Sequence, residues 1–188
     1  MNNLKKIENK IFNSNRFSLS QKEVDEIRKD LKKSNILILG AAGSIGNEFT
    51  KKIFNFNFKR LILIDKDENS LTDLNRDINL FFPKLKNKVD YIVLDITSSN
   101  IDEILKTKKI SHYFNFAAVK HVRSEENIES IRYMIGTNSY DFLPSKAFFL
   151  KKFFSISTDK SCNPKSILGI SKKIIEKNLK KFKDKFPK

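Results

Sequence analysis

Residues 36–46 read ILILGAAGSIG, four apolar residues followed by a loop with three glycines. The run Ile36–Leu39 is typical of a strand that is buried on both faces of a parallel sheet. Gly40, Gly43 and Gly46 stand at the junction with a helical segment, where free N–H groups and the positive end of the helix dipole suit a pyrophosphate. The stretch therefore predicts a dinucleotide-binding turn, and the alternative is an ordinary strand-to-helix turn.

Four further apolar runs follow along the chain, each of a length that suits one strand. They are Leu61–Ile64, Tyr91–Leu94, Tyr113–Phe116 and Phe153–Ile156. Residues at helical spacing lie between the runs, for example Leu71, Leu74 and Ile78. This alternation predicts right-handed βαβ units. We expect an α/β fold, a Rossmann-type doubly wound parallel sheet with helices on both faces.

A helical segment precedes the first strand. Ser20 and Glu23 have the spacing of a capping box, and apolar residues then recur at helical spacing through Leu31. We therefore expect a helical lead-in over residues 1–34 and an NAD(P)-binding Rossmann domain over residues 35–188. This domain is expected to be short at its C-terminal end, because it supplies five strands where such folds usually have about six.

Two acidic residues follow predicted strands. Asp65 stands about 20 residues after the glycine loop, where a carboxylate accepts hydrogen bonds from the adenosine ribose. Its charge would repel a 2′-phosphate, so NAD is favoured over NADP, although the neighbouring Lys66 weakens this preference. The alternative is an Asp that only begins a loop. Asp95, with Ile96, is expected to meet the adenine through its backbone.

The composition excludes several classes of protein. One cysteine, Cys162, allows no internal disulfide, and with only two histidines, His112 and His121, we expect no metal site. The first residues lack the apolar core of a signal peptide, and no apolar stretch is long enough to span a bilayer. We expect a cytoplasmic protein with no integral membrane segment. The net charge of +15 suggests nucleic acid as an alternative partner, but the lysines are spread through the whole chain.

Four stretches carry a family resemblance. They are GAAGSIGNEF at 40–49, LIDKDENSL at 63–71, NFAAVKHVRSEEN at 115–127 and STDKSCNPKSILGISKK at 157–173. In this order they resemble the extended short-chain dehydrogenase/reductase superfamily, and more narrowly its polysaccharide-biosynthesis branch. That branch contains UDP-N-acetylglucosamine 4,6-dehydratases and related sugar-nucleotide epimerases. The resemblance covers roughly residues 17–180, without the C-terminal substrate lobe of relatives.

The resemblance implies an NAD(P)-dependent enzyme acting on a UDP-sugar in polysaccharide or surface-glycan biosynthesis. The reaction implied is a 4,6-dehydration of a UDP-N-acetylhexosamine: hydride leaves carbon 4, water is lost across carbons 5 and 6, and the hydride returns. A UDP-sugar epimerase of the same family is one alternative. A truncated, non-catalytic nucleotide-binding module is another.

The resemblance also assigns roles to single residues. Thr158 would hold the 4-oxygen of the sugar, Asp159 would act as the general acid, and Lys160 would act as the general base. The base role requires surroundings that disfavour the charged form of Lys160. Lys172 would bind the nicotinamide ribose. The alternatives are that Thr158 and Asp159 cap the next helix and that Lys172 is a solvated lysine.

The expected cofactor site extends over all the strand ends. It comprises Gly40, Ala42, Gly43, Ser44, Ile45, Gly46, Asp65, Asp95, Ile96, Ala117, Ala118, Lys120 and Lys172.

The chain departs from the family pattern at two positions. Leu168 stands four residues before Lys172, where most of the superfamily has the proton-transferring Tyr. Tyr133 stands three residues before Gly136, where relatives have an Asn that supports the active-site backbone. The first departure places more of the implied chemistry on Asp159 and Lys160.

The C-terminal segment KKIIEKNLKKFKDKFPK predicts a basic helix with Ile174, Ile175, Leu179 and Phe182 on one side. Relatives pair through this helix, so we expect a homo-oligomer. Contact with anionic lipid is the alternative.

Overall fold

A computed structural model gives the fold and describes residues 18–98, 100–120 and 125–185. Residues 1–17 of the lead-in and 121–124 of the third family stretch therefore lie outside the description. The strands are β1 (Asn35–Leu39), β2 (Arg60–Asp65), β3 (Val89–Val93), β4 (His112–Asn115) and β5 (Lys152–Ser155). The helices are α2 (Gln21–Leu31), α3 (Ser44–Ile53), α4 (Glu68–Phe81), α5 (Ile101–Thr107), α6 (Ile128–Ser139) and α7 (Ile167–Lys185).

The five strands form one parallel sheet in the order β3-β2-β1-β4-β5. Ile36 of β1 pairs with Leu61 of β2 on one side and with His112 of β4 on the other. The order of strands reverses between β1 and β4, and in open α/β sheets this switch point is where ligands bind, beyond the carboxyl ends of the strands. The predicted Rossmann-type fold is confirmed.

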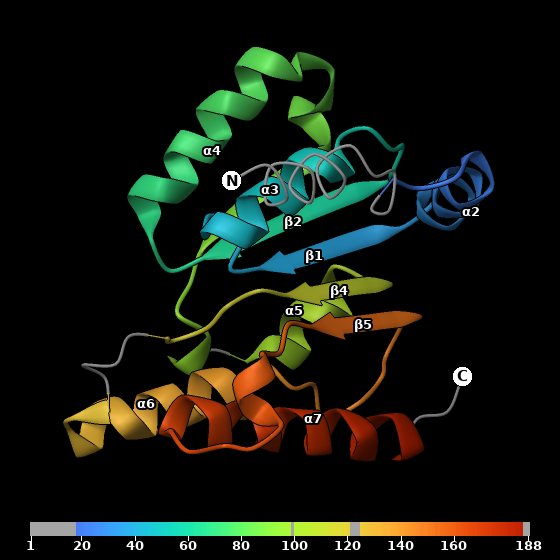
Figure 1. Cartoon of the computed structure of the whole chain (residues 1–188). Helices are drawn as coiled ribbons and strands as arrows, with labels where there is room; N and C mark the ends of the chain where they lie inside the picture. Colours follow the sequence, from blue (N-terminus) through green and yellow to red (C-terminus); the bar gives the residue numbers. More distant parts are fainter. Residues whose placement is uncertain (1–17, 99, 121–124, 186–188) are drawn as a thin grey trace, which may run out of the picture.

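Successive side chains along β1 point to opposite faces of the sheet and pack into two separate cores. Ile36 and Ile38 are fully buried on the face covered by α2, α3 and α4, whereas Leu37 and Leu39 pack with residues of α5 and α7 on the other face. Figure 1 shows α3 and α4 on one side of the sheet and α6 and α7 on the opposite side. The continuous apolar run of β1 thus reflects burial on both faces.

Three strands are shifted relative to the predicted runs. The run predicted at Tyr91–Leu94 belongs to a strand that begins at Val89, and β4 and β5 each end one residue earlier than predicted. Phe116 and Ile156 still donate backbone hydrogen bonds, to Leu39 O and Asn115 O. They lie just beyond the ladder, where the chain turns toward the ligand-binding edge.

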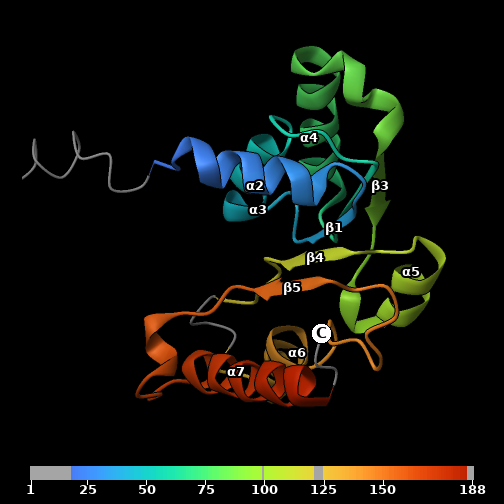
Figure 2. The same cartoon turned by 90° about the vertical axis from the view of Figure 1, so that its right-hand side faces the viewer.

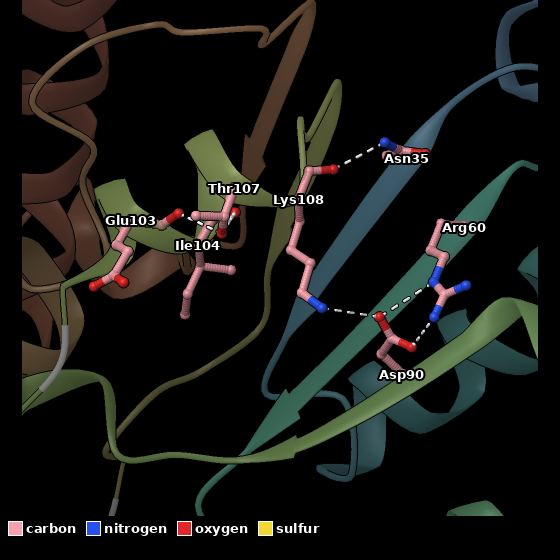
Figure 3. Close-up of polar contacts among 7 residues, drawn as sticks. All are labelled: Asn35, Arg60, Asp90, Glu103, Ile104, Thr107 and Lys108. Atoms are coloured by element: carbon pink, nitrogen blue, oxygen red, sulfur yellow. Dashed lines mark hydrogen bonds and ion pairs between the residues drawn. The ribbon is translucent and has the colours of Figure 1, made fainter.

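Charged residues bind one another at the amino ends of the strands (Figure 3). Asp90 of β3 forms ion pairs with Arg60 of β2, at 2.6 Å, and with Lys108, the residue that follows α5 as its C-cap, at 3.3 Å. The backbone carbonyl of Lys108 also accepts a hydrogen bond from Asn35 Nδ2 at 2.8 Å. These contacts tie the end of α5 to the start of the sheet.

The lead-in helix α2 is held at the same edge. Its predicted capping box is present, because Ser20 and Glu23 exchange the two hydrogen bonds of that motif. Near the other end of α2, Asp30 binds both Lys152 of β5 and the buried His112 of β4. Leu31 of α2 belongs to the same buried core as Ile53 of α3, and Figure 2 shows α2 on the same side of the sheet as α3 and α4. Within the described ranges, no helix combines the length and the apolarity needed to cross a bilayer.

Candidate functional site

A cavity of about 580 Å³ lies at the carboxyl edge of the sheet. It is lined by the segments that follow all five strands and by residues of α6 and α7. The predicted site residues that line it are Gly40, Gly43, Ser44, Ile45, Gly46, Asp65, Asp95, Ile96, Ala117, Ala118, Lys120, Thr158, Lys160 and Lys172. Ala42 and Asp159, also predicted, do not line the cavity. The fold therefore gathers residues from Leu39 to Lys172, which lie 133 positions apart in the sequence, around one cavity.

The glycine loop requires glycine at two positions for different reasons. Gly40 has φ +74°, and a Cβ atom at this residue would lie 2.5 Å from the backbone nitrogen of Ala117. A Cβ atom at Gly46 would lie 2.0 Å from the carbonyl oxygen of Gly40. The loop is thus packed against the segment after β4 and against the first turn of α3. This packing leaves the N-terminus of α3, at Gly43, open toward the cavity without a side-chain cap.

Asp65 at the end of β2 fixes the glycine loop as well as facing the cavity. One carboxylate oxygen accepts the N–H of Ala42 at 2.9 Å, and the other accepts the N–H of Asp67 at 3.1 Å. Ala42 thus contributes through its backbone bond to Asp65 rather than by lining the cavity. Its N–H faces Asp65, so the carboxylate and the loop form one rigid unit.

Tyr133, which departs from the family pattern, also lines the cavity. Its hydroxyl donates to Asp95 Oδ2 at 2.8 Å and accepts from Lys66 Nζ at 3.0 Å. Partial burial raises the pKa of Asp95, but hydrogen bonds from Thr97 and Tyr133 outweigh this effect, so the net direction is downward. Asp95 therefore stays ionised. Lys66 after β2, Asp95 after β3 and Tyr133 of α6 are thus joined at this end of the cavity.

Asn138 on α6 supports the backbone after β4. Its side-chain amide accepts the N–H of Val119 and donates to the carbonyl of Val119, both at 2.9 Å. It also donates to Ser171 Oγ of α7 at 3.1 Å. Asn138 is buried and supports the backbone of the site. In the family resemblance, this role belongs to an Asn at the place where this chain has Tyr133. The segment containing Ala117 and Ala118 is thereby fixed beside the glycine loop.

The segment after β5 presents Thr158 and Lys160 to the cavity. Thr158 Oγ1 donates to Asp159 Oδ1 at 2.9 Å, and it caps the short 3-10 turn Asp159–Ser161 by accepting the N–H of Lys160. The side chains of Asp159 and Lys160 are exposed. In the described conformation Asp159 is turned toward Thr158, which is why it does not line the cavity.

Glu176 of α7 binds the two ends of this segment through hydrogen bonds. Its Oε1 accepts hydrogen bonds from Ser157 Oγ at 2.6 Å and from Ser161 Oγ at 2.5 Å. The two serines flank the Thr158–Lys160 stretch. These hydrogen bonds, the one from Ser157 first, lower the pKa of Glu176. Sequence reasoning did not identify Glu176, because its spacing of one helical turn after Lys172 is also typical of a solvated helix face.

Lys172 is buried at the base of the cavity. Its Nζ donates to the carbonyl of Ile156 at 3.2 Å, and burial lowers its pKa to about 8. Gly169 explains why α7 approaches so closely, because a Cβ atom there would lie 2.6 Å from the carbonyl oxygen of Lys160. Lys172 can therefore lose or gain a proton near neutral pH, unlike a solvated lysine.

Leu168 and Thr137 complete the inner wall. Leu168 stands where most of the superfamily has Tyr, and its side chain has no proton to exchange. The hydroxyl of Thr137 is buried and has no hydrogen-bond partner among the described residues. A buried hydroxyl of this kind costs free energy unless a ligand or water binds it.

Comparison with known proteins agrees with this geometry. A family model described as polysaccharide biosynthesis protein matches residues 36–187. The chain belongs to this family. The resemblance inferred from the four sequence stretches is thus confirmed, and the family match begins at the first residue of the β1 apolar run.

Curated relatives of this polysaccharide biosynthesis family member include CapD of Staphylococcus aureus, a capsular polysaccharide biosynthesis protein. It is 30% identical over 155 residues, which cover 80% of this chain and 25% of CapD. A UDP-N-acetylglucosamine 4,6-dehydratase (inverting) of Campylobacter jejuni is 28% identical over 143 residues, covering 73% of this chain and 40% of that protein. The family member described here therefore spans less than half the length of either relative.

Among solved structures, a UDP-glucuronic acid 4-epimerase mutant from Bacillus cereus superimposes with a TM-score of 0.67 at 21% sequence identity. The match covers 81% of this chain and 53% of the epimerase. A putative short chain dehydrogenase from Pseudomonas syringae has a TM-score of 0.65 at 14% identity. These likenesses show that the family member shares the short-chain dehydrogenase fold.

Proposed function

We propose that this chain is the dinucleotide-binding part of an NAD(P)-dependent enzyme that modifies a UDP-sugar in polysaccharide biosynthesis, most closely a UDP-N-acetylhexosamine 4,6-dehydratase. One observation carries the proposal. A single cavity at the switch point of the sheet joins the glycine loop and Asp65 to Thr158, Lys160 and Lys172. Lysines and a hydroxyl beside a dinucleotide turn suit hydride and proton transfer on a sugar.

The residues present fit a dinucleotide. A Cβ atom at Gly46 would force the loop or α3 to move, the N-terminus of α3 carries no side-chain cap, and the Thr137 hydroxyl inside the cavity lacks a partner among the described residues. When bound, the dinucleotide would supply a reversible hydride acceptor. The glycine loop would hold the pyrophosphate, and Asp65 would bind the adenosine ribose, which favours NAD. Lys172 would bind the nicotinamide ribose.

The sugar chemistry falls to the segment after β5. Thr158 Oγ1 would hold the 4-oxygen of the sugar. Lys160, shielded from water by the bound sugar, would take the proton from carbon 5 once carbon 4 is a ketone. The 4-hydroxyl proton released in that oxidation would pass through Thr158 Oγ1 to Asp159, which would then protonate the hydroxyl that leaves carbon 6 as water. Asp159 must turn away from Thr158 between these two steps, because the two side chains bind each other in the described conformation. The returning hydride would add to carbon 6, and Lys160 would return its proton to carbon 5. The cycle is redox-neutral, so no external reductant is required.

Dinucleotide binding is the first test. We expect NADH to bind with an increase in its fluorescence, and Asp65→Ala to weaken the binding by about tenfold, since it removes the ribose acceptor and releases Ala42. Glu68→Ala, at an exposed position in the first turn of α4, is the control that leaves binding unchanged. Failure of the wild-type chain to bind NADH or NADPH would refute the proposal.

Turnover is the second test. A mass loss of one water from UDP-N-acetylglucosamine, absent in Lys160→Ala, would identify a dehydratase. An epimer of unchanged mass would identify an epimerase. Binding without either product would favour a non-catalytic nucleotide-binding module, the second candidate, for which Leu168 in place of a proton-transferring Tyr is the specific observation.

A further inference from the structure

Lys66, Tyr133 and Asp95 form a hydrogen-bonded chain across the end of the cavity next to β2 and β3. Lys66 Nζ lies 3.0 Å from the Tyr133 hydroxyl, which in turn lies 2.8 Å from Asp95 Oδ2. Lys66 Nζ also lies 4.9 Å from the centre of the Tyr133 ring, within range of a cation–π contact. All three residues line the cavity. Tyr133 thus holds a positive charge that the cavity would otherwise offer to a ligand.

The position of Lys66 makes this contact relevant to cofactor choice. Lys66 directly follows Asp65, and in dinucleotide folds the end of this strand meets the 2′ position of the adenosine ribose. A free ammonium group there would attract a 2′-phosphate, whereas the Asp65 carboxylate would repel it. Which of the two adjacent charges faces the ribose decides between NAD and NADP.

The hydrogen-bond directions keep Lys66 away from that position. Asp95 is itself fixed by the N–H and the hydroxyl of Thr97, at 3.0 and 2.8 Å. The Tyr133 hydroxyl donates its proton to Asp95, so its lone pairs face Lys66. The hydrogen bond with Tyr133 is the main cause that raises the pKa of Lys66, so the ammonium group stays charged and bound.

We propose that Tyr133 is a specificity-determining residue, which favours NAD(H) over NADP(H) by holding the Lys66 ammonium group at Asp95 and leaving Asp65 as the charge that faces the ribose 2′ position. This inference rests on the proposed dinucleotide binding and deepens it. Removal of the phenol oxygen breaks the hydrogen bond to Lys66 and leaves only the contact with the ring, so Lys66 should become able to reach a 2′-phosphate.

The test compares ligands that differ only in the 2′-phosphate. Dissociation constants for NADH and NADPH are measured by fluorescence titration, and adenosine 2′,5′-bisphosphate and 5′-AMP are measured by competition against NADH. In Tyr133→Phe, which keeps the ring, we expect affinity for the two 2′-phosphorylated ligands to rise about tenfold, while affinity for NADH and 5′-AMP changes by about twofold or less. In the double variant Tyr133→Phe with Lys66→Ala, the gain should disappear.

Tyr140→Phe is the matched control, because Tyr140 is exposed at the end of the same helix and does not line the cavity. It should change none of the four constants. An unchanged NADPH-to-NADH ratio in Tyr133→Phe, or a gain that persists without Lys66, would overturn the inference while leaving dinucleotide binding intact. A wild-type chain that binds neither dinucleotide would refute the proposed function, and the inference with it.

Discussion

The amino edge and the carboxyl edge of the sheet differ in how completely their polar side chains are paired. At the amino edge, Asp90 binds Arg60 and Lys108, and Asp30 binds His112 and Lys152. At the carboxyl edge, Lys172 is buried with a backbone carbonyl as its hydrogen-bond partner, and the Thr137 hydroxyl is buried without a partner, in the part of the chain that the structure describes. Pairing at one edge stabilises the fold, whereas incomplete pairing at the other is typical of a binding site.

The largest effect on stability and on NADH binding is expected for Gly46→Ala, because no additional atom fits at this position of the glycine loop. Gly46→Ala would place a Cβ atom 2.0 Å from Gly40 O, so the loop or helix α3 must move. We expect a loss of about 3 kcal/mol in the free energy of unfolding, together with loss of detectable NADH binding. Gly43→Ala is the control for stability, because its Cβ would lie at an ordinary 3.5 Å from the same oxygen. Equal denaturation midpoints for the two variants would contradict the packing argument.

Lys172→Met should stabilise the fold while weakening dinucleotide binding. The pKa of Lys172 is lowered by burial from 10.5 to about 8, so the folded chain bears the cost of the buried charge below pH 8. Between about 8 and 10.5 the unfolded chain binds more protons than the folded chain, so wild-type stability rises with pH.

The measurement for this variant is chemical denaturation at several pH values. At pH 7, Lys172→Met should be more stable than the wild type by up to about 3 kcal/mol, and the difference should shrink as pH rises toward 10.5. Lys173→Met, next in the sequence on the same helix and less buried, is the control that gives no such profile. A destabilised Lys172→Met would show that this lysine is part of the structural framework.

At the amino edge, Asp90→Ala should lower the stability of the fold and leave dinucleotide binding unchanged, whereas Lys172→Met should do the opposite. Loss of Asp90 leaves Arg60 and Lys108 without their shared carboxylate, and we expect a loss of about 1 kcal/mol in stability with NADH affinity unchanged. The hydrogen bond from Arg60 is the main cause that lowers the pKa of Asp90, so the contribution is present above the unfolded carboxyl pKa and is lost as pH falls through the lower folded value. Weaker NADH binding in this variant would mean that the two edges are coupled.

The smallest effect is expected for Glu176→Gln. The change removes the charge that accepts the hydrogen bonds of Ser157 and Ser161, at a cost of about 0.5–1 kcal/mol. Because the pKa of Glu176 is lowered in the fold, the difference from wild type should be present above pH 4.5 and vanish as pH falls through the folded value. Faster amide hydrogen exchange at Ser161 and Cys162, with NADH affinity unchanged, would identify Glu176 as a positioning residue.

The sequence predicted those parts of the fold that depend on residues close together in the chain. The five strands, the glycine loop and the capping box each depend on neighbouring residues, and all are present. The hydrogen bonds of Tyr133 join it to Lys66 and to Asp95, which lie 67 and 38 positions away along the sequence. Contacts of this kind depend on how α6 packs against the sheet, which periodicity does not specify.

Two predicted site residues that do not line the cavity, Ala42 and Asp159, show the same limit of local sequence patterns. Ala42 and Asp159 belong to matching sequence stretches, but the N–H of one binds Asp65 and the carboxylate of the other binds Thr158. A sequence pattern gives the position of a residue in the chain and not the direction of its polar groups. Asn138 illustrates the converse, since it supports the Val119 backbone from a position that no motif indicated.

The placement of α2 has a practical consequence. This helix lies at the amino edge of the sheet, on the side away from the strand ends that line the cavity (Figure 1). Lys22 and Glu26 on α2 are exposed. A biosensor that anchors the chain to a chip through either position would orient every molecule with its nucleotide-facing side toward the flowing solution.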